Sequence, residues 1–154
     1  MTNLAVFAAG CFWGIEEKFL STPGVLNTEV GYTGGITNNP SYQDVCSGTT
    51  EHAEAVRISF DSDKISFKEL VIIFFSIHDP TTLNRQGPDI GTQYRSEIFC
   101  LDDDQYLIAD AVKRNLNKEM FNGNIVTSVS RAEKFWIAEE YHQKYIRKKK
   151  NMIL

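Results

Sequence analysis

The stretch Gly10-Cys11-Phe12-Trp13-Gly14 lies between an apolar run, predicted to be a buried strand, and a helical pattern. Cys11 is predicted to stand in the first turn of that helix, where unpaired backbone N–H groups and the positive end of the dipole favour a thiolate. At least one of Phe12 and Trp13 is expected to flank the sulfur as an apolar wall. The alternative is that Cys11 is a small buried hydrophobe and that both rings pack in the core.

The order of the patterns along the chain predicts an α+β fold. It reads strand, helix, strand, strand, helix, strand, helix, strand, helix, which indicates a mixed β-sheet with helices packed against it, a two-layer sandwich with a ferredoxin-like core. Strands are expected at residues 4–8, 25–32, 53–60, 96–101 and 125–129, and helices after the 10–14 stretch, after the capping box at 66–69, after the acidic run at 102–104 and over 138–149.

Size and composition indicate one catalytic domain spanning residues 1–154. Of the 154 residues, 42% are hydrophobic, which is enough for a sizeable core. A formal net charge of -4 gives no basic footprint for nucleic acid, and the basic run at 147–150 is expected to be a solvated helix end. No apolar run is long enough to span a membrane, and residues 4–9 are too few for a signal peptide. We therefore expect a cytoplasmic protein, and a monomer.

The cysteines exclude a disulfide framework. There are three of them, Cys11, Cys46 and Cys100, at wide spacing, with no C-x-x-C pair and no Cys/His zinc pattern. A reducing compartment and the absence of a structural metal follow.

Two long loops are expected to contribute to the site. One spans residues 34–50 and carries Tyr42, and the other spans residues 81–94 and carries Asp89 and Tyr94. Both are rich in glycine and polar residues and are too long for simple turns. Long ordered loops often carry function.

Cysteine chemistry leaves four reactions open: peroxide reduction, disulfide exchange, acyl transfer and sulfoxide reduction. Acyl transfer needs a base, yet His52 and His78 lie in or beside loops without an obvious orienting partner, and His142 is expected to be far away on the terminal helix. Disulfide exchange of the thioredoxin type requires a C-x-x-C pair, which is absent.

Sulfoxide reduction needs a thiolate, a proton donor for the oxygen, further donors to hold that oxygen, and an apolar notch for the methyl group. Glu54, between two alanines at the start of a predicted strand, can be kept protonated by apolar surroundings and act as the acid. Tyr42 and Tyr94 offer phenolic donors. The sequence can therefore supply each part.

Separated motifs over nearly the whole chain resemble those of the peptide methionine sulfoxide reductase A family. They are GCFWG at 10–14, GYTGG at 31–35, PSY at 40–42, VCSG at 45–48, HAEAV at 52–56 and DIGTQYRS at 89–96. The resemblance implies reduction of the S epimer of methionine sulfoxide, free or in proteins, through a cysteine sulfenic acid that thiols, ultimately thioredoxin, resolve without a bound cofactor. The residues it assigns are Cys11 as the nucleophile, Phe12 and Trp13 for the substrate methyl, Glu54, Tyr42 and Tyr94 for the sulfoxide oxygen, and Asp89 to help order the site.

Two features depart from the family's pattern. Glu51 precedes His52 where a glycine is expected, and its negative charge near the entrance is expected to disfavour acidic peptides. Many members carry resolving cysteines in a C-terminal tail, whereas the last four residues, 151–154, contain none. Cys46 is then the better internal candidate for resolving the sulfenic acid, with an external thiol as the alternative. Cys100 is expected to be buried or remote.

Two rival functions remain open. A peptide-binding module for methionine or oxidised methionine would use the aromatic slot, but it would need neither Cys11 nor Glu54. A thiol peroxidase would reduce peroxide without needing Trp13 as a wall for a methyl group. Comparing the turnover of hydrogen peroxide with that of methyl sulfoxides distinguishes the peroxidase from the reductase.

Overall fold

A six-stranded sheet runs through the structure, a computed structural model that describes residues 2–153. The strand order is β7-β6-β1-β3-β2-β8, and neighbouring strands are antiparallel except for β6 and β7, which are parallel. The strands are β1 (Thr2–Ala9), β2 (Val25–Thr33), β3 (Ala53–Asp61), β6 (Ser96–Cys100), β7 (Ser128–Arg131) and β8 (Trp136–Ile137).

Four of these strands and two helices form the predicted ferredoxin-like core. The chain order is β1, α1, β2, β3, α3, β6, and the sheet order of the same strands is β6-β1-β3-β2, so each helix connects two strands that have another strand between them. The mixed sheet with helices against it confirms the α+β prediction. The helices are α1 (Phe12–Leu20), α2 (Tyr42–Cys46), α3 (Phe67–Ser76), α4 (Asp103–Glu119) and α5 (Tyr145–Ile153).

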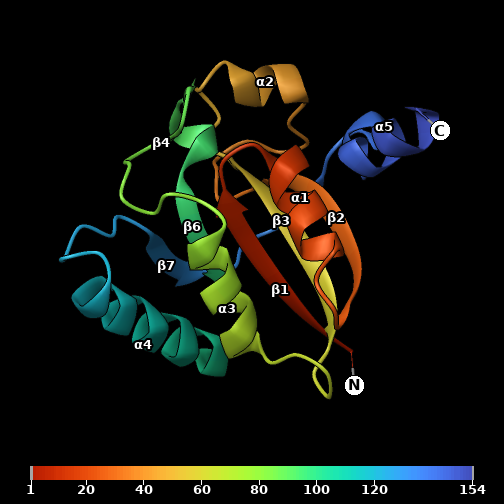
Figure 1. Cartoon of the computed structure of the whole chain (residues 1–154). Coiled ribbons are helices and arrows are strands. Elements are labelled where there is room, and N and C mark those ends of the chain that lie inside the picture. The colour runs from red at the N-terminus through yellow and green to blue at the C-terminus, as the bar shows by residue number, and fades with distance from the viewer. Residues whose placement is uncertain (1, 154) are drawn as a thin grey trace.

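The two faces of the sheet are covered differently because side chains alternate along each strand. Ala5 and Phe7 of β1 lie in the larger core cluster with residues of α1, α3 and α4. Val6 and Ala8 face the opposite side, where Phe135 packs against a smaller cluster. Figure 1 shows α1 and α3 lying across the same face of the sheet. The helices therefore form the second layer of the sandwich.

Strand register sends Glu54 toward the helical layer. Glu54 is paired with Tyr32 across β3 and β2, and both side chains are buried. Val56 and Ile58 follow Glu54 at two-residue spacing and belong to the core cluster under the helices. The Glu54 carboxylate therefore reaches the start of α1, where it accepts the Phe12 N–H. Figure 1 shows α2 and β4 at this same end of the sheet.

The two loops expected at residues 34–50 and 81–94 contain short elements. Within the first, α2 begins at a capping box in which the Ser41 hydroxyl accepts the Asp44 N–H and the Asp44 carboxylate accepts the Ser41 N–H. Within the second lie β4 (Arg85–Gln86), β5 (Asp89–Ile90) and a 3-10 turn, η1 (Thr92–Tyr94). These elements give both loops a defined conformation.

The last two predicted elements are misplaced along the chain. The last predicted strand, expected at residues 125–129, corresponds to β7. It begins at Ser128, beside Glu97 of β6, rather than at residue 125. Before that point the Val126 N–H donates to the Pro80 carbonyl, and the Ile125 N–H donates to the Asn117 side chain. These tertiary bonds take the backbone donors that a longer strand would use.

The terminal helix begins at Tyr145, not at residue 138. The preceding residues form β8 beside β2 and a 3-10 turn, η2 (Glu140–His142). The Gln143 side chain then bonds both the N–H and the carbonyl of Val30, and Lys144 has a left-handed φ of 52°. Helical geometry across 138–144 would break these bonds to the sheet, so the helix starts after them.

Candidate active site

Cys11 lies at the N-cap position of α1, directly after Gly10, whose φ of 101° suits glycine. Its side chain is half-buried. Burial raises the pKa of the Cys11 thiol, while the backbone N–H groups of Trp13 and Gly14 oppose that rise. The helix start does favour the thiolate as predicted, but desolvation outweighs it. The expectation of a favoured thiolate is therefore wrong.

Glu54 contacts the helix that begins after Cys11. Its side chain is 1% exposed, and its Oε1 accepts the Phe12 N–H at 3.1 Å. Burial raises the pKa of Glu54 to about 7, with the Asp89 carboxylate adding to the rise and the Phe12 N–H opposing it. A carboxyl group with a pKa near neutrality can carry a proton and release it. This is the environment expected for Glu54.

Electrostatic interactions also link the Cys11 thiol to nearby carboxylates. Glu54 and Asp89 both raise the pKa of Cys11 after the larger effect of burial. Asp89 belongs to β5 and Glu54 to β3, so the loop and the sheet meet at the cysteine. When Glu54 is protonated, its repulsion of the thiolate disappears, and the two groups therefore titrate interdependently.

Tyr42 and Tyr94 are both partly buried in the same region. Burial, followed by the Glu54 carboxylate, raises the pKa of Tyr94 to about 12. The pKa of Tyr42 is raised by burial and then by its hydrogen bond with the Cys46 thiol. Both phenols therefore keep their protons at neutral pH and remain hydrogen-bond donors.

The two aromatic residues after Cys11 occupy different environments. Phe12 is 1% exposed and packs in the core beside Tyr32, with ring centroids 5.8 Å apart. Trp13 is only partly buried, and one face of its indole stacks on Tyr145 at 3.9 Å and 10°. Trp13 therefore offers the accessible aromatic surface, whereas Phe12 is buried in the core.

His142 is part of this aromatic cluster, contrary to the expectation that it is far away. It is fully buried, and its Nδ1 accepts the Trp13 Nε1–H at 3.0 Å. Its ring also lies 5.2 Å from that of Phe12 and 4.5 Å from that of Tyr42. Sequence reasoning missed this residue because the segment was assigned to a helix. No local pattern signals the contact, which joins residues 129 positions apart.

The other cysteines differ in accessibility. Cys46 is exposed at the end of α2, whereas Cys100 is buried, as expected, and burial raises its pKa to about 11. Glu51 is exposed and has a φ of 60°, a left-handed conformation that glycine adopts more easily. This conformation accounts for the glycine expected at that position.

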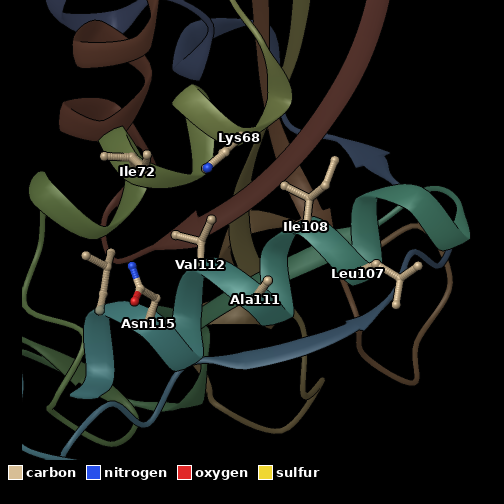
Figure 2. A pocket seen from close by; sticks show the side chains of 8 residues that line it. Lys68, Ile72, Leu107, Ile108, Ala111, Val112 and Asn115 are labelled. Atoms are coloured by element: carbon tan, nitrogen blue, oxygen red, sulfur yellow. The ribbon is translucent and has the colours of Figure 1, made fainter. Parts of the chain in front are cut away.

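Other possible binding features lie elsewhere or are absent from the described residues. A cavity of about 530 Å³ lies between α3 and α4, and Figure 2 shows its lining, which contains no candidate site residue. Within residues 2–153, no three or more His, Cys, Asp or Glu side chains are grouped to hold a metal ion. In the same part of the chain, no helix is both long and apolar enough to cross a membrane.

A thiol that can supply electrons and a carboxyl group that can supply a proton meet at one end of the sheet. These are the requirements of thiol-based reduction, so the fold and the site define a cysteine-dependent oxidoreductase. The model of the family described as peptide methionine sulfoxide reductase matches residues 3–153, and the chain belongs to that family.

Similar proteins agree with this assignment. Peptide methionine sulfoxide reductase MsrA of Methanothermobacter thermautotrophicus is 52% identical over 145 residues, which are 94% of this chain and 86% of the relative. The crystal structure of reduced Mxr1 from Saccharomyces cerevisiae has a TM-score of 0.91 at 37% identity, covering 96% of this chain and 85% of that one. Mxr1 in complex with Trx2 has a TM-score of 0.68 at 26% identity, covering 94% and 84%.

Proposed function

We propose that this protein reduces the S epimer of methionine sulfoxide, free or in proteins, to methionine. Membership of the peptide methionine sulfoxide reductase family supports the reaction. The observation that carries the mechanism is the buried Glu54 carboxyl, which has a pKa of about 7 and is bonded to the backbone N–H next to Cys11. A module that only binds methionine has no need of this pair.

In the proposed reductive step, the Cys11 thiolate attacks the sulfoxide sulfur while Glu54 donates a proton to the sulfoxide oxygen. The attack forms a bond between the two sulfur atoms, and the sulfoxide oxygen, protonated by Glu54 and then from solvent, leaves as water as the sulfur–oxygen bond breaks. A water molecule then attacks the Cys11 sulfur, which breaks the sulfur–sulfur bond, releases a proton and leaves a sulfenic acid on Cys11. Two electrons pass from the cysteine sulfur to the substrate sulfur, which leaves as the thioether of methionine. Substrate binding must also displace water and stabilise the thiolate, because burial raises the pKa of Cys11.

The phenolic hydroxyls of Tyr42 and Tyr94 are proposed to hold the sulfoxide oxygen. Their raised pKa values keep both groups protonated as donors, and the contribution of the Glu54 carboxylate to both shifts supports this role. Asp89, which acts electrostatically on Cys11 and Glu54, helps order the same site.

Trp13 is proposed to receive the substrate methyl group, with Phe12 beneath it. The indole is held by the His142 hydrogen bond and by the Tyr145 stack, so its remaining face keeps a fixed orientation. A fixed aromatic plane binds a methyl group without losing the entropy of ordering the ring. Because Phe12 is 1% exposed, it is proposed to contribute by packing within the core that supports the site.

Recycling is proposed to use external thiols, with thioredoxin as the reductant. The complex of Mxr1 with Trx2 supports that partner. Cys46 on α2 remains the candidate for an internal resolving cysteine, since the Tyr42 hydroxyl connects it to the site.

The three free cysteines fit a cytoplasmic location, where such an enzyme repairs proteins under oxidative stress. We further propose one catalytic domain and a monomer, supported by a sheet that joins strands from both ends of the chain.

The test is a single-turnover reaction without reductant. The protein is incubated with each methionine sulfoxide epimer, and methionine released per chain is counted. We expect at least one equivalent from the S epimer and none from the R epimer. Release near zero from both epimers would end the proposal, and faster turnover of hydrogen peroxide than of methyl sulfoxides would favour a thiol peroxidase.

A further inference from the structure

Gln86 bonds the hairpin of β4 and β5 to the end of α3. Its side-chain Oε1 accepts the Asp79 N–H at 2.9 Å, and its Nε2 donates to the Asp79 carbonyl at 2.8 Å. Asp79 follows α3 closely, while Gln86 is the second residue of β4. The side-chain amide thus satisfies both backbone groups of one residue across the loop.

The stem of the same side chain lies against the backbone before the nucleophile. A Cβ placed on Gly10 would come within 2.8 Å of Gln86 Cγ and 2.9 Å of Gln86 Cβ. Gly10 ends the turn from β1 into α1 and is followed directly by Cys11. The methylene groups of Gln86 therefore fill the space left by the missing side chain of Gly10.

Gln86 is also the strand partner of Asp89. The two residues face each other in the β4–β5 hairpin. Asp89 acts electrostatically on Cys11 and on Glu54, so a movement of this hairpin changes the field at both groups. We infer that Gln86 is a positioning residue that clamps the hairpin to Asp79 and Gly10 and thereby fixes Asp89 beside Cys11. This inference rests on the proposed role of Cys11 as the nucleophile.

The charged and titratable groups around Cys11 define what the clamp controls. Glu54 faces it from β3, Asp89 from β5 and Tyr94 from η1, while the Trp13 and Gly14 N–H groups approach from α1. Of the two carboxylates, Asp89 is on the hairpin that the glutamine holds. Loosening the hairpin therefore weakens the repulsion of the thiolate by Asp89 and leaves Glu54 on β3 and the N–H groups of α1 in place.

Gln86→Met tests the clamp, because methionine keeps an unbranched stem and removes both amide hydrogen bonds. The readout is the pH dependence of Cys11 alkylation, followed by mass spectrometry of the Cys11 peptide. We expect the midpoint of reactivity to move down by about half a pH unit or more relative to wild type. An unchanged midpoint in the folded variant overturns the inference.

Gln105→Met is the matched control. Gln105 makes the same two kinds of bond, accepting the Leu101 N–H at 3.0 Å and donating to the Leu4 carbonyl at 2.8 Å, at the opposite end of β1 from Cys11. Losing these two hydrogen bonds destabilises the fold by a similar mechanism and leaves the contacts of the β4–β5 hairpin unchanged. The alkylation midpoint should stay at the wild-type value, and an equal shift in this control also overturns the inference.

A double-mutant cycle with Asp89→Asn identifies the route of the effect. Asp89→Asn alone should lower the midpoint, and adding Gln86→Met to it should produce little further shift, because the charge is already gone. A second shift as large as the first contradicts positioning through Asp89.

Hydrogen exchange in the wild-type protein provides a test without any variant. The Asp79 amide should be protected from exchange, and rapid exchange there rejects the clamp.

Alkylation of Cys11 does not depend on turnover. The result therefore stands apart from the test of the proposed function. If Cys11→Ser kept full reductase activity, the nucleophile assignment would fail while the measured clamp between Gln86 and Asp79 would remain.

Discussion

At the residue scale, the site joins a cysteine and a carboxylic acid whose pKa values are both raised by burial. The Glu54 pKa of about 7 suits a proton donor, whereas the raised pKa of Cys11 leaves most of the thiol protonated at neutral pH. The two effects are coupled through charge, since ionised Glu54 disfavours ionised Cys11. In the mechanism proposed above, the reactive state therefore has a protonated Glu54 beside a Cys11 thiolate.

Cys11→Ser should abolish methionine formation while leaving the fold intact. A serine hydroxyl stays protonated near neutral pH and is a poor nucleophile toward sulfur, and serine is favoured at an N-cap. Single-turnover release of methionine measures the loss. Cys100→Ser is the control because Cys100 is buried outside the site and should keep the wild-type rate. Wild-type release from the Cys11 variant would move the nucleophile to another cysteine.

Glu54→Gln should slow the reductive step by roughly 10²–10⁴-fold, because an amide can donate a hydrogen bond but cannot transfer its proton. The wild-type rate should be bell-shaped in pH, since Glu54 must be protonated and Cys11 deprotonated. In the variant only the thiol titrates, so the rate should rise with pH without the bell. Stopped-flow single turnovers from pH 5 to pH 10 measure both features. An unchanged rate with lost affinity would make Glu54 a binding residue only.

At the element scale, the residues between β8 and α5 hold the site together although none belongs to a long helix or strand. Glu139 accepts the Tyr32 hydroxyl at 2.8 Å and the Tyr42 N–H at 2.9 Å, so it ties β2 to the start of α2. The Glu16 carboxylate of α1 accepts the Lys144 N–H from the same segment. This connection joins the helix that carries Cys11 to the one that carries Tyr42.

His142→Phe should weaken substrate binding about 5- to 10-fold with a smaller effect on the reductive rate. Phenylalanine keeps a buried ring but removes the acceptor for the Trp13 Nε1–H, a hydrogen bond worth about 1 kcal/mol. Indole fluorescence in a Trp136→Phe background, together with substrate affinity from single-turnover rates, measures the change. Tyr141→Phe, at an exposed neighbour, is the control. Equal affinity in the two variants would remove His142 from the support of Trp13.

At the scale of the whole molecule, burial of Glu54 opposes stability. Its pKa in the folded protein is about 7, against an ordinary 4.5, so the folded state binds the proton more tightly than the unfolded state does. Its contribution to stability is therefore present below pH 4.5 and is lost as the pH rises through 7. Burying this carboxyl group therefore lowers the stability of the fold at alkaline pH.

Glu54→Gln should therefore be more stable than wild type at pH 8, by on the order of 2 kcal/mol, and the difference should shrink toward pH 5. Urea unfolding at the two pH values measures it. Glu119→Gln, at an exposed position on α4, should show no such pH-dependent difference. A variant less stable than wild type at pH 8 would contradict the raised pKa.

Recycling also depends on how separate elements approach each other, here α2 and the start of α1. After one turnover without reductant, a disulfide between Cys11 and Cys46 would leave one of the three thiols free, whereas a persisting sulfenic acid leaves two. We expect two free thiols and trapping by a dimedone-type reagent, because Cys46 is exposed and already engaged with Tyr42. One free thiol, lost in Cys46→Ser, would establish the internal route.

The sequence by itself determined the features that local patterns encode. Residue patterns located β2 and β3, and the capping box at Ser66 located α3. The same patterns grouped Glu54 with Arg57 and Ser59, opposite Ile58 and Phe60, whereas the structure places Glu54 on the core side with Val56 and Ile58. The motif at residues 10–14 placed Cys11 at a helix start, and the loops with Tyr42 and Tyr94 were expected near it. Each of these depends on residues that are close together in the chain.

Only the tertiary structure decided the features that depend on distant partners. His142 reaches Trp13 because Gln143 and Lys144 bond to β2 and α1, which holds the segment out of the helix that its own sequence favours. The thiol pKa of Cys11 likewise follows from burial beneath several elements, which outweighs the local effect of the helix start. Desolvation and long-range hydrogen bonds are sums over the folded neighbourhood, and a pattern of neighbouring residues does not contain them.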